Sequence, residues 1–252
     1  SGSREVRSSY CGVSISSLGR LFLGKRFIRQ QCLIAPCVPC TKMAELHERL
    51  SVVITTSPIR SNPATMMIEE LFESFKLCPG LAECPKVVVC DGCNVADKEK
   101  YRDGKVTEDQ AAKYAAFCDA LEKLAEEVWS RTTIVRMPER IGFAHAAYAG
   151  LQHVETELVT VVQHDLFFVR EVDYTSLCDT LMQHSGKVNY ITLPGPKHLT
   201  LQQDVLSKYG IRCEFTTEFG PRLLPVIYWF DKTHVCKTSW YKSFVYGGGS
   251  GV

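Results

Sequence analysis

The sequence lacks the features that mark several classes of protein. No run of about 18 apolar residues is present, so no transmembrane segment is predicted. Lysine and arginine number 29 against 28 acidic residues, and a net charge of +1 gives no strong field to attract nucleic acid. The 17 glycines and 11 prolines are too few for collagen, and 45% hydrophobic residues argue against wholesale disorder. The composition therefore predicts a globular chain without a nucleic-acid partner.

Three motifs of well-known enzyme classes are also absent. No G-x-G-x-x-G opens a helix after the first predicted strand, which disfavours a dinucleotide-binding fold. No G-x-x-x-x-G-K-[ST] is present, which excludes a P-loop nucleoside triphosphatase. The absence of G-x-S-x-G removes the usual signature of an α/β-hydrolase.

The N-terminal segment differs in charge from the rest of the chain. Residues 1–43 carry seven basic residues and one glutamate, a charge of +6, which leaves 22 basic against 27 acidic residues, or −5, for the remainder. Together with its many serines, this composition predicts a basic tail over residues 1–45 that is either transit-like or disordered. The compartment stays open between plastid, secretory lumen and cytoplasm.

Twelve cysteines are present, and two pairs have C-x-x-C spacing, at Cys37/Cys40 and Cys90/Cys93. Two such pairs can hold a structural zinc ion, and a single pair can be redox-active. These pairs lie far apart, however, and the second follows a strand that looks buried. Most of the other cysteines have apolar neighbours, so we predict mainly reduced cysteines that act as small hydrophobic residues.

From residue 46 onward, short β-branched runs alternate with amphipathic segments. Continuous apolar runs predict strands that are buried on both faces of a parallel sheet, and the alternation predicts an α/β fold flanked by helices. Strands are expected at Leu50–Thr56, Lys86–Cys90, Thr132–Arg136, Leu158–Gln163, Tyr190–Leu193 and Val226–Phe230, and helices at Asn62–Phe75, Thr107–Val128, Phe143–Val154, Tyr174–His184 and Leu201–Tyr209.

Ligands of such sheets bind beyond the carboxyl ends of the strands. Hydroxyl groups follow the first strand, an Asp-Gly pair follows the second, and Gln-His-Asp follows the fourth. Candidate ligand-binding residues are accordingly Thr55, Thr56, Ser57, Arg60, Asp91, His164 and Asp165. Each has a plainer interpretation, because Ser-Pro ends strands, Asp-Gly makes turns and Asp165 could cap a helix.

Three blocks, in order, resemble GT-A fold glycosyltransferases of the large inverting family that includes cellulose-synthase-like enzymes. They are LSVVITTSPIRSNP, KVVVCDG and RIGFAHAAYAGLQHVETELVTVVQHD. TTSP, CDG, QHD and WFDKTH together resemble a glycosyltransferase-like group of algal and protist proteins. The resemblance implies a GT-A domain over residues 46–246 that moves a sugar, with inversion, from a nucleotide-diphosphate sugar to an unknown glycan, lipid or protein acceptor.

The resemblance also implies roles for individual residues. Asp165 takes the last position of the family's D-x-D motif and would ligate Mn²⁺ or Mg²⁺, although Gln163 replaces the first aspartate. His234 would complete the metal shell, or is merely exposed after a Thr233 cap. Asp91 would bind the nucleobase, and Gly142 would admit the donor or simply form a turn. Thr55, Thr56, Ser57, Arg60 and His164 would line the donor site.

The catalytic base cannot be assigned, because the E-D or T-E-D motif of the family does not follow the last strand. Either the domain is truncated at its C-terminus or another residue serves. A noncatalytic sugar-nucleotide binding module fits Gln163 and the missing base. A nucleotidyltransferase would need a glycine-rich basic loop after the first strand, where only Arg60 is found. A zinc-knuckle interaction protein is the remaining alternative.

Overall fold

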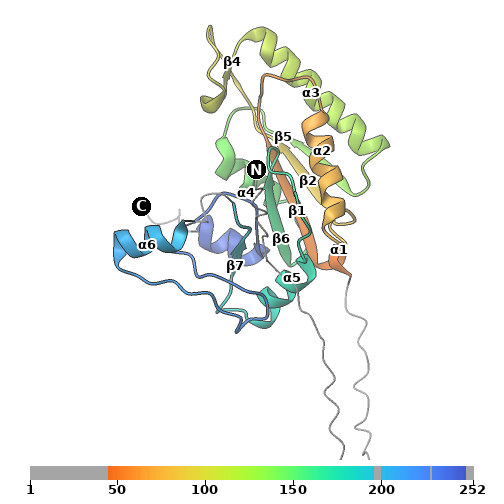
Figure 1. Ribbon diagram of the computed structural model, residues 1–252. Coiled ribbons are helices and arrows are strands. Elements are labelled where there is room, and N and C mark those ends of the chain that lie inside the picture. The colour runs from red at the N-terminus through yellow and green to blue at the C-terminus, as the bar shows by residue number, and fades with distance from the viewer. Residues whose placement is uncertain (1–44, 196–199, 228, 248–252) are drawn as a thin grey trace, which may run out of the picture. The chain divides into compact units, whose positions relative to one another are not determined.

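The computed structural model describes residues 45–195, 200–227 and 229–247 (Figure 1). Six strands form one sheet in the order β5-β2-β1-β6-β8-β7. Strands β5, β2, β1 and β6 are parallel to one another, while β8 is antiparallel to β6 and β7. The bounds are β1 Leu50–Thr56, β2 Lys86–Cys90, β5 Thr132–Arg136, β6 Leu158–Gln163, β7 Tyr190–Thr192 and β8 His234–Lys237. The predicted α/β class with a mainly parallel sheet is confirmed.

The four parallel strands begin and end at the residues that their apolar runs predict. Every residue of β1 and β2 is buried, as are the first five of β6. Both faces are covered because alternate side chains of a strand point to opposite sides, where different helices pack. Val52 and Ile54 belong to the core on one face, whereas Val53 belongs to the core on the other.

The first face is covered by α2 (Met66–Ser74), the 3₁₀ turn η1 (Phe75–Leu77), α3 (Glu108–Glu127) and α5 (Tyr174–Gln183). Figure 1 shows α2 and α3 on the same side of the strands. A capping box is present at the start of α3, where the Thr107 hydroxyl accepts from Gln110 N and the Gln110 side chain accepts from Thr107 N. This box satisfies two N–H groups that a helix start leaves unpaired.

Helix α4 (Gly142–Leu151) covers the second face. It approaches the sheet so closely that a Cβ at Gly150 would lie 2.6 Å from Val53 Cγ1 and 2.9 Å from Val89 Cγ2. Glycine at this position therefore sets the distance between α4 and the two central strands.

The remaining elements connect the sheet or extend it. They are α1 (Leu46–Arg49), β3 (Asn94–Val95), η2 (Tyr101–Asp103), β4 (Lys105–Val106), α6 (Leu201–Tyr209), α7 (Thr238–Trp240) and a π-helical turn, η4 (Tyr241–Val245). Among the described residues, no helix is long and apolar enough to cross a membrane. The eight described cysteines are free thiols, and Cys37 and Cys40 lie outside the described part.

Two predicted elements were wrong. The helix expected from Asn62 begins at Met66, because the Asn62 side chain accepts from Ile59 N at 2.7 Å and closes a turn instead. The strand expected at Val226–Phe230 is not formed by its described residues, and β8 at His234–Lys237 pairs with β6. The Phe230 carbonyl instead accepts from Tyr190 Oη at 2.6 Å.

Candidate functional site

The candidate site lies at the point where the order of the strands in the sheet reverses relative to the sequence. From β1 the chain proceeds to β2 and β5 on one side, and β6 then pairs with β1 on the other. Ligands of open α/β sheets bind in the crevice outside the carboxyl ends of the strands at such a switch point. In this sheet the carboxyl ends of β1 and β6 on either side of the switch point are Thr56 and Gln163.

Four of the predicted site residues meet at this edge. His164 N donates to Thr55 O at 3.1 Å, which joins the end of β6 to β1. Asp91 N donates to Thr56 O at 2.8 Å, which joins the end of β2 to β1. Thr55, Thr56 and Asp91 are buried, and Ser57 is half-buried.

Asp91 is fixed by its own side chain as well as its backbone. Its carboxylate accepts from Ile141 N at 2.8 Å and from Gly142 N at 3.0 Å, at the start of α4. The Asp91 carbonyl accepts from the buried Tyr114 hydroxyl at 2.8 Å. A carboxylate at a helix N-terminus satisfies unpaired N–H groups and suits the helix dipole. Asp91 therefore caps α4, and each carboxylate oxygen retains a second lone pair for a ligand N–H.

The neighbouring glycines are required for two different reasons. A Cβ at Gly92 would lie 2.2 Å from the backbone carbon of Glu139, so the loops after β2 and β5 touch at this point. Gly142 has a φ of +78°, which other residues adopt only with strain, but a Cβ would meet nothing within 4 Å. The space that a side chain at position 142 would enter is therefore open.

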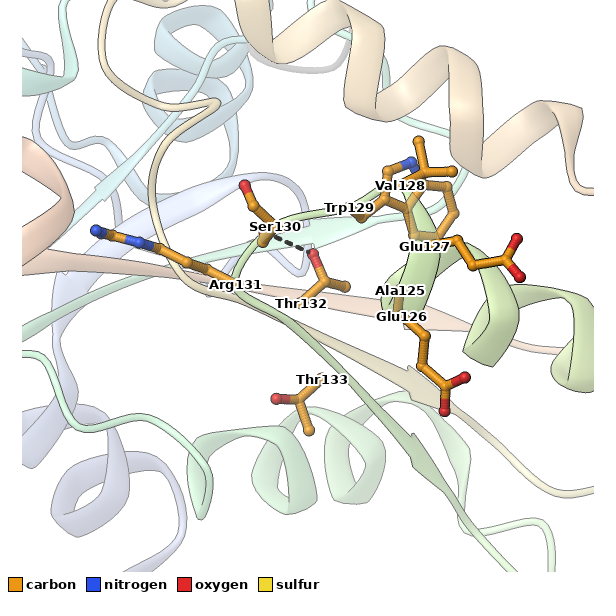
Figure 2. A pocket seen from close by; sticks show the side chains of 9 residues that line it. All are labelled: Ala125, Glu126, Glu127, Val128, Trp129, Ser130, Arg131, Thr132 and Thr133. Atoms are coloured by element: carbon orange, nitrogen blue, oxygen red, sulfur yellow. Dashed lines mark hydrogen bonds between the residues drawn. The ribbon is translucent and has the colours of Figure 1, made fainter.

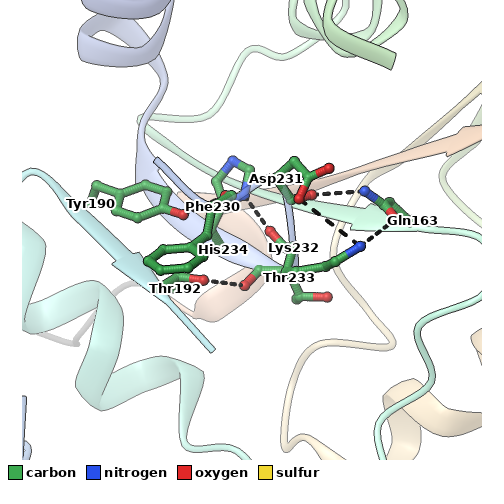
Figure 3. Close-up of polar contacts among 8 residues, drawn as sticks. All are labelled: Gln163, Tyr190, Thr192, Phe230, Asp231, Lys232, Thr233 and His234. Atoms are coloured by element: carbon green, nitrogen blue, oxygen red, sulfur yellow. Dashed lines mark hydrogen bonds and ion pairs between the residues drawn. The ribbon is translucent and has the colours of Figure 1, made fainter. Parts of the chain in front are cut away.

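The carboxyl end of β6 is contacted by the loop that precedes β8 (Figure 3). Gln163 Nε2 donates to the Asp231 carbonyl at 2.8 Å, and Lys232 Nζ donates to Gln163 Oε1 at 3.4 Å. Lys232 Nζ also lies 4.0 Å from Asp231 Oδ1. Sequence reasoning missed Lys232, although its position just after an apolar segment, in WFDKTH, was a possible signal.

The two histidines proposed from the sequence have different environments. Burial lowers the pKa of His164, an effect that the nearby Asp165 carboxylate partly offsets, and its Nδ1 has no hydrogen-bond partner. His234 is fully buried, and its Nδ1 lies 2.6 Å from Lys232 O. Its ring packs against Tyr190 and Trp229, with centroid distances of 5.1 and 5.3 Å. Burial lowers the pKa of His234 to about 4, so the ring is neutral at pH 7.

The residues at this edge do not form a ready site for a divalent cation. Hard cations need several oxygen ligands, and Mg²⁺ usually takes one or two carboxylates together with water and substrate phosphates. Asp165 is exposed, both polar atoms of the Gln163 amide already have protein partners, and the Lys232 ammonium lies next to them. Nowhere in the described ranges do three His, Cys, Asp or Glu side chains gather as a possible metal site.

Arg60 lies at a separate polar cleft of about 250 Å³ beside the loop that follows β1. Its guanidinium donates to Glu99 Oε1 at 2.8 Å and lies 5.7 Å from the ring centroid of Tyr101. Gln110 binds the second oxygen of Glu99. Arg60 is therefore engaged by an acidic partner, at a cleft that no described residue of β6 lines.

A larger cavity, about 530 Å³, lies at the opposite edge of the sheet (Figure 2). It is lined by the continuous segment 125–133, where α3 ends and β5 begins. None of the predicted site residues borders it. Its position at the amino end of a parallel strand does not match the usual location of ligands in such sheets.

Comparisons with known proteins give only distant similarities. No protein-family model matches the chain, and no curated protein matches its sequence. Among solved structures, the chain is similar to the mannosyltransferase PcManGT from Pyrobaculum calidifontis in complex with GDP-Man and Mn²⁺. The identity is 15% and the TM-score 0.44, and the match covers 78% of this chain and 46% of that chain. It is also similar to S. aureus TarS in complex with UDP-GlcNAc, with 15% identity, a TM-score of 0.43 and coverage of 78% and 47%.

A third similar structure is a CMP:2-keto-3-deoxy-manno-octonic acid synthetase complexed with CTP, with 11% identity, a TM-score of 0.39 and coverage of 78% of this chain and 77% of that chain. These neighbours thus include a mannosyltransferase and a synthetase, and each of the three structures holds a nucleotide or nucleotide sugar. The chain spans about half the length of the mannosyltransferase and TarS chains named above.

Proposed function

We propose that the chain is a transferase that takes a nucleotide-diphosphate sugar as donor and binds it at the carboxyl edge of β1, β2 and β6. The observation that carries the proposal is the convergence of Thr55, Asp91 and His164 at the switch point of the sheet. The sequence blocks that resemble inverting GT-A glycosyltransferases contribute these same residues.

In this proposal, Asp91 accepts a hydrogen bond from an N–H group of the nucleobase. Its carboxylate is held in place by the start of α4, so it needs no rearrangement to receive the base. The open space at Gly142 admits the donor next to it. Hydroxyl and N–H groups of Thr55, Thr56 and Ser57 complete the nucleotide-facing edge.

The end of β6 would face the diphosphate and sugar. His164 is half-buried there, and burial lowers its pKa, which favours the neutral ring at pH 7. Asp165 is exposed beside it and is available to ligands from solution. The predicted participation of Mn²⁺ or Mg²⁺ through Asp165 and His234 would require the buried His234 ring to leave its aromatic surroundings.

The experiment is a donor screen on the whole chain. We would titrate it with UDP, GDP, CDP and ADP and their common sugar conjugates, with thermal unfolding as the readout of binding. Release of nucleoside diphosphate would then be measured with panels of glycan, lipid and peptide acceptors. Acceptor-dependent release is the expected result.

Three other outcomes would change the assignment. Binding of sugar nucleotides without release would favour a noncatalytic binding module. Release of pyrophosphate from a nucleoside triphosphate and a sugar phosphate would favour a nucleotidyltransferase. No shift of the unfolding temperature with any nucleotide would contradict the proposed function.

A further inference from the structure

The geometry of the β6 edge points to Lys232 as the group that neutralises the diphosphate of the donor, in place of a divalent cation. This inference rests on the proposed function, because it concerns the phosphate end of the same donor site. The resemblance to the D-x-D motif implied a metal ion at this position. The contacts of Gln163 favour a lysine in its place.

The first step is the position of the ammonium group. Gln163 is the last residue of β6, and its Cα is paired with that of Thr55 on β1. Lys232 Nζ lies 3.4 Å from the Gln163 side-chain oxygen (Figure 3). The positive charge is therefore held at the β6 border of the switch point, where the phosphates of a nucleotide would lie.

The second step is the orientation of the Gln163 amide. Its Nε2 donates to the Asp231 carbonyl at 2.8 Å, which turns Oε1 toward the ammonium. An aspartate at this position would have added a negative charge for a metal ion, whereas glutamine adds none. A divalent cation bound at Gln163 would lie close to the Lys232 ammonium, which is 3.4 Å from Gln163 Oε1. The two positive charges would repel each other.

The third step is the capacity of the lysine for a further partner. An ammonium has three N–H donors, and a strong charge-assisted hydrogen bond measures about 2.7–2.9 Å. The contacts of Lys232 with Gln163 Oε1 and Asp231 Oδ1 measure 3.4 and 4.0 Å, and its side chain is 43% exposed. These contacts are weak. The ammonium can therefore donate to a phosphate oxygen without first breaking a strong ion pair.

Arg60 is less suited to this role. Its guanidinium is already bound to Glu99 at 2.8 Å, and its side chain is 79% exposed. It borders the separate cleft beside η2 and the start of α3 rather than the end of β6. Of these two cations, only Lys232 contacts a residue that belongs to the switch point.

The experiment is a calorimetric titration of the whole chain with UDP, GDP, and the nucleosides uridine and guanosine, once in EDTA and once in Mn²⁺. The variants are Lys232→Ala, Lys232→Arg and, as a matched exposed lysine with an acidic partner, Lys187→Ala. We expect UDP or GDP to bind in EDTA, with a change in Kd of less than about threefold on adding Mn²⁺. Lys232→Ala should weaken diphosphate binding on the order of 10- to 100-fold, the effect of one charge-assisted hydrogen bond.

The remaining arms separate phosphate contact from general damage. Lys232→Arg should keep most of the affinity, Lys187→Ala should keep all of it, and nucleoside binding should be the same in every variant. Diphosphate binding that requires Mn²⁺ and is unaffected by Lys232→Ala would overturn the inference and leave the proposed function intact. Equal loss of nucleoside and diphosphate affinity in Lys232→Ala would also overturn it. No binding of any nucleotide under either condition would overturn both.

Discussion

Replacement of Asp91 by alanine tests how the candidate site is built. Asp91 is 5% exposed, and its two carboxylate oxygens accept from Ile141 N and Gly142 N at 2.8 and 3.0 Å. The alanine variant would leave two N–H donors at the start of α4 without their partner. Each lost hydrogen bond to a charged group costs about 1.5–3 kcal/mol, and water that enters the open space at Gly142 recovers part of it.

We therefore expect Asp91→Ala to lower the free energy of unfolding by about 3 kcal/mol. For a domain of this size the melting temperature should fall by roughly 6–12 °C, because 1 kcal/mol corresponds to about 2–4 °C. Asp91→Asn keeps one acceptor oxygen and leaves one of the two N–H groups without an acceptor, so it should lose about 2 kcal/mol, less than the alanine variant. The exposed Asp97→Ala is the control, with an expected change within about 0.5 kcal/mol.

Urea unfolding followed by circular dichroism measures these differences. A loss below about 1 kcal/mol for Asp91→Ala would refute the reasoning, because an uncompensated loss of two such bonds cannot be that small. The stable Asp91→Asn variant then serves for nucleotide titration. It should bind the base more weakly than the wild type does, since its amide offers one acceptor where the carboxylate offers two.

Three further predictions concern the fold around the site. Gly150→Ala should cost about 1–3 kcal/mol of stability in urea unfolding, because its Cβ would lie 2.6 Å from Val53 Cγ1; an unchanged midpoint would contradict the close packing of α4. Thr107→Ala should cost about 1 kcal/mol by the same assay, through loss of the α3 cap, and Thr107→Ser should restore most of it. Burial holds the folded-state pKa of His234 at about 4, below its ordinary value of 6.5. As the pH drops from about 6.5 to 4, the unfolded state therefore binds a proton that the folded state does not, and the stability of the fold decreases. His234→Phe should remove about 3 kcal/mol of that fall, as measured by urea unfolding across this pH range, and a pH profile identical to wild type would contradict it.

The sequence predicted the parallel part of the sheet because burial on both faces leaves a continuous β-branched run. Strand β6, for example, reads LVTVVQ and begins and ends where this pattern does. The last strand was misplaced because the segment VIYWF is as apolar as the parallel strands. The strand that actually forms, β8, has only the four residues HVCK. Which segment pairs with β6 depends on long-range contacts, such as that of Tyr190 Oη with Phe230 O, which periodicity does not reveal.

The site could be predicted only in part, for the same reason. The rule that ligands bind at carboxyl ends of strands was enough to group Thr55, Asp91 and His164, which the hydrogen bonds of the structure do bring together. The capping of α4 by Asp91 joins residues that are 50 positions apart. The contact of Lys232 with Gln163 spans 69 positions and depends on the path of the loop before β8.

The most direct test of the account is amide hydrogen exchange of the whole chain with and without saturating UDP or GDP. Bound nucleotide should slow exchange at the ends of β1, β2 and β6, near Thr56, Asp91 and His164. Segment 125–133, which lines the larger cavity, should exchange at the same rate in both states. Protection confined to segment 125–133, or no protection at the three strand ends despite measured binding, would contradict the location of the donor site.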